Sequence, residues 1–174
     1  MGAADFDLTM DELRTVVRFA ADCAEELLPE FDAVAPDDLR PRDAIDAARA
    51  FADGARRSNL QRTAAFASHR AAKEVSDETA QLAALACGDA AAAAYLHPIA
   101  KASQVGHILR AAACAARVAE VKTGTSDSDR VRVLADRATP PLPEILRRYP
   151  EAPTGRSRVS QLMSALDSAI RERD

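Results

Sequence analysis

The sequence predicts an all-α protein, and three observations support this prediction. Alanine fills about 40 of the 174 positions, whereas there are only five Phe, two Tyr and no Trp. Alanine is the best helix former, and strands favour the aromatic and β-branched side chains more than alanine. Apolar residues also recur every three or four positions along most of the chain, which is the helical period. We therefore expect one compact domain, residues 1–174, built as an array of about seven helices.

The first helix is expected to begin near Thr9, which can act as its N-cap, with Asp11 and Glu12 in the first turn. The helix dipole favours negative charge at that end. Residues 1–8 should form a flexible N-terminus, and Pro29 should kink or break the helix. The side expected to face the core repeats at helical spacing and consists of Leu13, Val16, Val17, Ala20, Cys23, Ala24, Leu27, Leu28 and Phe31.

Three further helices should follow. The second starts with Pro41 at its first position and ends at Gly54. Ser76 should cap the fourth, which ends at His97-Pro98 because the residue before a proline avoids the helical conformation. The third spans about residues 59–75, and its expected buried side consists of Leu60, Ala64, Ala67, Ala71 and Val75.

Two leucines serve as markers of the expected core. Leu27 lies on the apolar side of the first helix, and Leu85 lies among the alanines of the fourth. Aspartate at either position should prevent folding, because it would bury an unpaired carboxylate among aliphatic side chains.

The last third of the chain begins within a fifth helix, expected from Pro98 to about Lys122 and capped by Gly124. A capping box at residues 126–129 should begin the next helix. Residues 140–157 form a proline-rich connection with one short helical turn at residues 144–149.

The final helix is expected from Arg158 to about Arg171. Its single apolar stripe favours docking onto the core over a coiled-coil seam, because it is short. The stripe consists of Val159, Leu162, Met163, Leu166, Ala169 and Ile170.

Composition argues against a membrane protein and against disulfides. The longest stretches without a charge, residues 79–88 and 90–100, are about half of the ~20 residues that a membrane span needs. The N-terminal residues resemble neither an export signal nor a lipidation signal, so we expect a cytoplasmic protein. Three widely spaced cysteines, Cys23, Cys87 and Cys114, should be reduced and packed in the core.

Patterns typical of enzymes and metal sites are not found. The histidines His69, His97 and His107 lack the i, i+4 spacing that lets two imidazoles share a metal, so we expect neither a metal nor a cofactor. There is no glycine-rich phosphate loop and no nucleophile elbow, so no catalytic residue is expected. A polar centre that joins Asp89, His97 and His107 stays open, although histidines more often satisfy a helix end or a core position.

A basic stripe on the third helix is a candidate for partner binding. On a helical wheel Arg62, Phe66, His69 and Lys73 share one stripe, and Arg70 flanks it. Such a stripe could bind phosphates or an acidic protein surface. The alternative is a solvated face with Phe66 packed against a neighbouring helix.

Acidic residues are concentrated near the N-terminus. Residues 1–46 hold 13 acidic and 4 basic side chains, a net charge of -9, and the whole chain has a net charge of -4. On the exposed side of the first helix, Asp22, Glu25 and Glu26 could bind a basic partner by electrostatic steering. Acidity of this kind argues against a nucleic-acid partner. The alternative is ordinary solvated charge.

Six short segments of the chain also carry a resemblance. They read RPRDAIDAAR at residues 40–49, AAFASH at 64–69, GDAAA at 88–92, AYLHP at 94–98, QVGHIL at 104–109 and LRRYP at 146–150. They resemble a bacterial family of type-five-like immunity proteins from polymorphic toxin systems. The resemblance implies an all-helical protein that neutralises a cognate toxin, and it supplies no catalytic or binding residues.

Three functional hypotheses follow. The first is an immunity protein whose partner is its cognate toxin. The second is a small helical ligand-binding domain or enzyme with a polar centre that includes His69, His97 and His107. The third is a structural module that forms homo-oligomers through the apolar stripe of the last helix.

Overall fold

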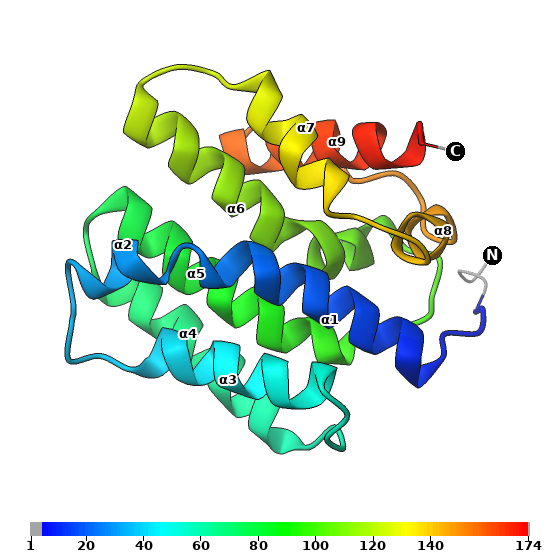
Figure 1. Ribbon diagram of the computed structural model, residues 1–174, viewed down its shortest axis with the longest axis horizontal. Coiled ribbons are helices and arrows are strands. Elements are labelled where there is room, and N and C mark those ends of the chain that lie inside the picture. The colour runs from blue at the N-terminus through cyan, green and yellow to red at the C-terminus, as the bar shows by residue number, and fades with distance from the viewer. Residues whose placement is uncertain (1–4, 174) are drawn as a thin grey trace.

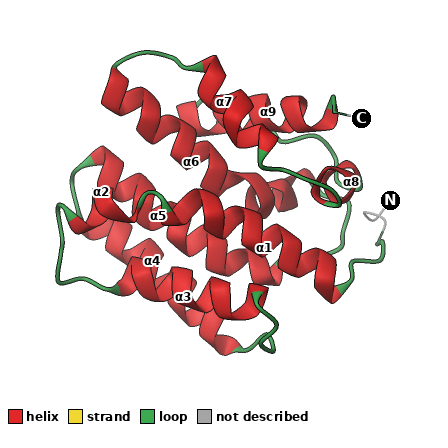
Figure 2. Cartoon of the chain, in the orientation of Figure 1, coloured by secondary structure: helices red, strands yellow, loops and turns green. Residues whose placement is uncertain are grey.

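Helices make up the regular structure of the computed structural model, which describes residues 5–173 (Figures 1 and 2). Within these residues there is no strand, and seven of the nine α-helices have at least seven residues, so the all-α prediction is confirmed. Two short 3₁₀ turns, η1 (Ala93–Tyr95) and η2 (Ala102–Gln104), precede α6. The α-helices are α1 (Met10–Glu25), α2 (Leu28–Asp32), α3 (Arg40–Ala52), α4 (Asn59–Glu74), α5 (Glu78–Ala92), α6 (Val105–Thr123), α7 (Ser128–Asp136), α8 (Leu142–Arg147) and α9 (Arg158–Arg171).

The central helix is α5, which packs against α1, α2, α3, α4 and α6 (Figure 1). It is apolar on nearly all sides, as expected of a helix surrounded by others. Further out, α6 packs against α7 and α9. Small alanine side chains let these helices approach closely, and the buried apolar residues form one connected core.

The start of α1 agrees with the sequence. Thr9 Oγ1 accepts a hydrogen bond from the Glu12 peptide N–H at 3.1 Å, and the Glu12 carboxylate accepts one from the Thr9 N–H at 2.9 Å. This reciprocal capping box satisfies two peptide N–H groups that the helix leaves free. Pro29 does interrupt the helix, because α1 ends at Glu25 and Pro29 lies in the first turn of α2.

Two expected core leucines are exposed instead. Leu60 is 56% exposed and borders a groove between α3 and α4. Leu85 is 36% exposed because it lies seven residues, or about two turns, from the exposed Glu78, on the side of α5 that solvent reaches. The prediction for Leu85 was therefore wrong, whereas Leu27 is buried as expected.

The chain after His97 does not form a helix at Pro98, contrary to the sequence prediction. The carbonyl of His97 accepts a hydrogen bond from the Tyr149 hydroxyl, and the carbonyl of Pro98 accepts one from the Phe6 N–H. These long-range partners hold the segment outside a helix, and α6 begins only at Val105.

Two helix starts lie one residue later than expected. Asp77 rather than Ser76 caps α5, with its carboxylate accepting from the Ala80 N–H at 2.9 Å. Asp127 rather than Ser126 caps α7 in the same way, accepting from the Arg130 N–H at 2.9 Å. In both places two neighbouring residues can act as caps, and the carboxylate does so.

Phe6 and α9, near the two ends of the described residues, pack against the rest of the molecule. Residues 1–4 of the segment expected to be flexible lie outside the described residues, and the ring of Phe6 packs edge-on against Tyr149 at 4.8 Å. The proline-rich connection contains α8. Helix α9 has the expected bounds, and its apolar stripe is buried against the core, principally through Leu162, Met163, Leu166 and Ile170. The stripe is therefore not available as the surface of a homo-oligomer, which the third hypothesis required.

The three cysteines, Cys23, Cys87 and Cys114, are free and buried, as predicted. Burial raises the pKa of Cys23 to about 12 and raises the pKa values of the other two thiols as well. These thiols therefore stay protonated and pack as small apolar groups. Among the helices that the structure describes, none has both the length and the apolarity to cross a membrane.

Candidate binding cleft beside helix α4

A cleft of about 270 Å³ lies where α4, α5, η1 and α6 meet. Most of its wall is apolar, and Ala65 and Ala92 contribute to it. Its polar and aromatic lining consists of Arg62, Phe66 and His69 from α4, Asp89 from α5, Tyr95 from η1, and His107 and Arg110 from α6. The cleft therefore brings together residues from both the predicted basic stripe and the predicted polar centre.

Asp89 forms the polar floor of the cleft and is only 6% exposed. Its Oδ1 lies 3.2 Å from His69 Nε2, and its Oδ2 lies 3.4 Å from Arg110 Nε. Neither contact has hydrogen-bond geometry, and within the described residues Asp89 Oδ2 and His69 Nε2 have no hydrogen-bond partner. A buried acceptor without a donor is energetically costly, so this floor is suited to receive a polar group from outside.

Gly88 allows the imidazole of His69 to lie close to α5. A Cβ atom at residue 88 would lie 2.4 Å from His69 Cδ2 and 3.0 Å from the carbonyl oxygen of Ala65. The absent side chain therefore lets the imidazole lie against α5 next to Asp89. A helical glycine costs about 1 kcal/mol relative to alanine, and here the packing of His69 explains its presence.

Phe66 and Arg62 form the rim. Phe66 is 59% exposed, so it is not packed into a neighbouring helix. The guanidinium of Arg62 lies over the ring of Tyr95 at 4.5 Å, and the Tyr95 hydroxyl donates a hydrogen bond to the Ser58 carbonyl at 2.5 Å. The Tyr95 ring thus positions a cation at the edge of the cleft.

The three histidines do not form one centre. His107 lines the cleft, and burial together with the nearby Arg110 lowers its pKa, so the imidazole is neutral at pH 7. His97 is an exposed residue outside the cleft lining, and its peptide N–H donates to the Gln104 side chain. The polar centre therefore contains His69, Asp89 and His107, without His97.

The other residues of the basic stripe lie further along α4. Arg70 and Lys73 are exposed and do not line the cleft. Within residues 5–173, neither of them nor Arg62 forms an ion pair. This stretch of α4 therefore presents uncompensated positive charge.

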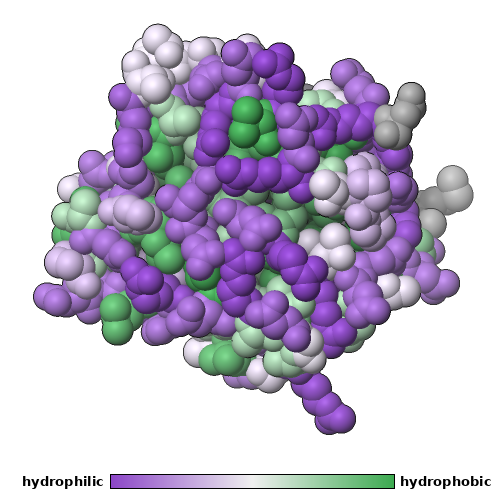
Figure 3. All heavy atoms as spheres, viewed as in Figure 1, coloured by the Kyte–Doolittle hydropathy of each residue, from purple (hydrophilic) through white to green (hydrophobic). Residues whose placement is uncertain are grey.

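The acidic residues of α1 are compensated by arginines from other helices. Arg49 contacts Asp22 at 2.6 Å and also pairs with Glu25. Glu26 pairs with two arginines of the α7 region, Arg130 and Arg137. Asp22, Glu25 and Glu26 are therefore each paired with an arginine from outside residues 1–46. Figure 3 shows that hydrophilic residues cover most of the face on which α1 lies.

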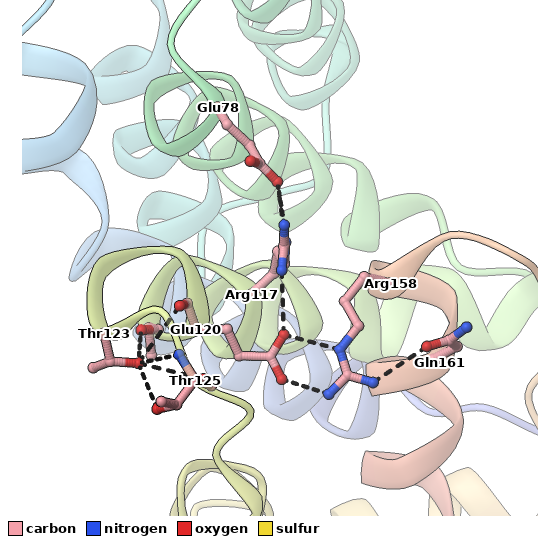
Figure 4. A network of polar contacts seen from close by, with 8 residues as sticks. Glu78, Arg117, Glu120, Thr123, Thr125, Arg158 and Gln161 are labelled. Atoms are coloured by element: carbon pink, nitrogen blue, oxygen red, sulfur yellow. Dashed lines mark hydrogen bonds and ion pairs between the residues drawn. The ribbon is translucent and has the colours of Figure 1, made fainter.

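A second polar cluster is internally satisfied (Figure 4). Buried Glu120 receives hydrogen bonds from Arg158 at 2.9 and 2.5 Å, and Arg117 joins it to Glu78. The hydrogen bonds from Arg158 lower the pKa of Glu120. These contacts fix α9 and α5 to α6, so the cluster is structural and differs from the unsatisfied floor of the cleft.

Sequence reasoning did not include Arg110, Tyr95 or Gly88 among the site residues. Arg110 follows His107 by three positions, which places both on one face of α6, and that spacing was an available signal. The contacts of Gly88 and Tyr95 with α4 depend on how helices pack, and periodicity does not reveal them.

The arrangement is suited to binding. In the described residues no three His, Cys, Asp or Glu side chains gather as a metal would require. The cleft offers an anionic acceptor at its floor, cations at its edge and an apolar wall, which are features of a recognition site. These features make the cleft a candidate binding site of this all-α protein.

The comparisons give its family. Residues 7–137 match the model described as Imm-5 like putative immunity protein. The match covers most of the chain, and the protein belongs to this family of immunity proteins, as the resemblance had predicted. Neither the curated proteins nor the solved structures gave a significant match.

Proposed function

We propose that this protein binds a cognate toxin and neutralises it in the cytoplasm of the bacterium that makes both. Membership of the immunity family supports a toxin as the partner. The binding surface that we propose is the α4 face, defined as Arg62, Phe66, His69, Arg70 and Lys73 together with Arg110 of α6.

The observation that carries this assignment is the exposure of Phe66 beside the cleft. Phe66 is an exposed aromatic side chain that borders the cleft, and cationic side chains of α4 flank it. Aromatic residues and arginines are enriched in protein interfaces relative to the rest of the surface. The α4 face combines both in one place.

Charge indicates the chemistry of the toxin surface. The cations Arg62, Arg70 and Lys73 lack internal ion pairs among the described residues, whereas Asp22, Glu25 and Glu26 have them. Acids that are already paired offer less attraction to a basic partner. We therefore propose that the α4 face meets an acidic toxin surface, and that the acidic side of α1 is the alternative surface for a basic toxin.

A co-expression rescue assay tests the function. A candidate toxin is expressed with the wild type, with a double reversal of Arg62→Glu and Arg70→Glu, or with a triple reversal of Asp22, Glu25 and Glu26 to lysine. The proposal predicts that the wild type and the triple reversal protect the cells and that the double reversal protects poorly. Failure of the wild type to protect contradicts the immunity function for that toxin, and loss of protection only in the triple reversal moves the surface to α1.

A second candidate function is a small-ligand-binding domain or enzyme, and the unsatisfied floor of the cleft favours it. It predicts that the wild type does not protect cells from the toxin and that His69→Ala or His107→Ala removes binding of the small ligand. The rescue assay and these two histidine variants therefore separate the two functions.

A further inference from the structure

We infer that the cleft accepts a tyrosine side chain of the partner, with the phenol hydroxyl at Asp89. This inference rests on the proposed function, because the tyrosine would belong to the toxin. It follows from what the floor and the walls of the cleft require of an occupant.

The floor requires a group that both donates and accepts a hydrogen bond. Asp89 Oδ2 is a buried acceptor without a donor, and His69 Nε2 is a buried polar atom without a partner. The guanidinium of Arg110, 3.4 Å from the carboxylate, adds donors at the same place. A single hydroxyl can donate to Asp89 Oδ2, the unpartnered acceptor, and accept from the guanidinium of Arg110.

Charged side chains do not fit this floor. A carboxylate has no hydrogen to donate and would lie against the charge of Asp89. A lysine or arginine would meet the cations of Arg110 and Arg62, which already border the cleft. The occupant is therefore neutral at its tip.

The walls require an apolar body. Most of the lining is apolar, with Ala65 and Ala92 in the wall and Phe66 at the rim, and the cleft holds about 270 Å³. A serine or threonine side chain would leave much of this space empty, and an amide side chain would place polar atoms against the apolar wall. Tyrosine combines an apolar ring with one hydroxyl at its tip. Its ring can stack on the ring of Phe66.

Binding of small probes to the isolated protein tests the inference without the toxin. N-acetyl-tyrosinamide is titrated against the labelled protein by NMR, with N-acetyl-phenylalaninamide as the probe that lacks only the hydroxyl. We expect the tyrosine probe to shift the signals of His69 and His107 and to bind at least about tenfold more tightly than the phenylalanine probe.

A cleft-filling variant locates the site. Ala92→Leu should abolish binding of the tyrosine probe, whereas Ala67→Leu, which lines the separate groove between α3 and α4, should not change it. If Ala92→Leu does not fold, the comparison of the two probes on the wild type still decides the question.

Four outcomes overturn the inference. They are equal binding of the two probes, tighter binding of N-acetyl-aspartamide, no binding of the tyrosine probe, and binding that survives Ala92→Leu. Toxin capture that depends on Phe66 but persists in a folded Ala92→Leu variant would leave the proposed function standing and refute the tyrosine. Binding of the tyrosine probe to the cleft, with no protection of cells from the toxin, would support the tyrosine site and contradict the proposed function.

Discussion

The imidazole of His69 occupies the space that a side chain at Gly88 would need, because a Cβ atom there would lie 2.4 Å from His69 Cδ2. The pair joins α4 to α5 beside the buried carboxylate of Asp89. One missing side chain in α5 thus sets the position of an α4 residue and with it the shape of the cleft.

Gly88→Ala should lower the free energy of unfolding by about 1–3 kcal/mol, because the added methyl group meets His69 and the Ala65 carbonyl. An alanine in a helix otherwise stabilises, so the sign is informative. Gly106→Ala is the matched control, because its added methyl group meets only the guanidinium of Arg110, which can move. Urea unfolding measures both. A Gly88→Ala protein as stable as Gly106→Ala would refute this packing. So would a double variant, Gly88→Ala with His69→Ala, that is no more stable than Gly88→Ala alone.

Leu27→Asp should abolish cooperative folding, whereas Leu85→Asp should cost less than about 1 kcal/mol. Leu27 is buried in the core and Leu85 lies where solvent reaches it. Thermal melts followed by circular dichroism check both variants. Equal loss of folding in the two would show that the side of α5 bearing Leu85 is in fact covered.

Acid should remove the part of stability that depends on Glu12. Hydrogen bonds from Arg148 and the Thr9 N–H lower the pKa of Glu12 from 4.5 to about 2 in the folded protein. A depressed pKa stabilises the fold above pH 4.5, and this contribution is lost as the pH falls from 4.5 towards 2. Glu12→Gln should therefore reduce stability at pH 7 and flatten its pH dependence in that window. Urea midpoints at several pH values measure this, and parallel curves for variant and wild type would contradict it.

Residues 138–174 should be needed for folding although the family match ends at residue 137. Leu146, Leu166 and Ile170 from this segment are fully buried, and Arg158 neutralises the buried Glu120. Removing the segment exposes part of the core and leaves that carboxylate without its partner. A protein ending at residue 137 should show no cooperative melt by circular dichroism, and a sharp melt near the wild-type temperature would be the opposite result.

Local signals in the sequence predict much of this fold. The N-cap at Thr9, the break at Pro29 and the cap at Gly124 depend on neighbouring residues, and all three occur as expected. Helical periodicity also places most core residues. It fails for Leu85, because an alanine-rich helix such as α5 has little amphipathic contrast to show which side faces solvent.

Long-range contacts set the features that the sequence does not reveal. The segment at Pro98 is held outside a helix by the backbone of Phe6 and the hydroxyl of Tyr149, both distant in sequence. Long-range packing also completes the candidate site. Helical spacing predicts which α4 residues lie together, whereas the packing of α6 against α5 brings Arg110 to them. Glu26 pairs with Arg130 and Arg137, which are distant in sequence. The net charge of residues 1–46 alone therefore does not show that Glu26 is already paired within the molecule.

The affinity of the toxin for Phe66→Ala tests the central claim most directly. Calorimetry with the purified toxin candidate compares this variant with Val133→Ala, which shortens another exposed apolar side chain, on α7. Our account predicts that Phe66→Ala weakens binding at least about tenfold, as for an interface hot spot, and that Val133→Ala binds as the wild type does. Equal affinities for the two variants, with both proteins folded, would contradict the assignment of the α4 face as the toxin-binding surface.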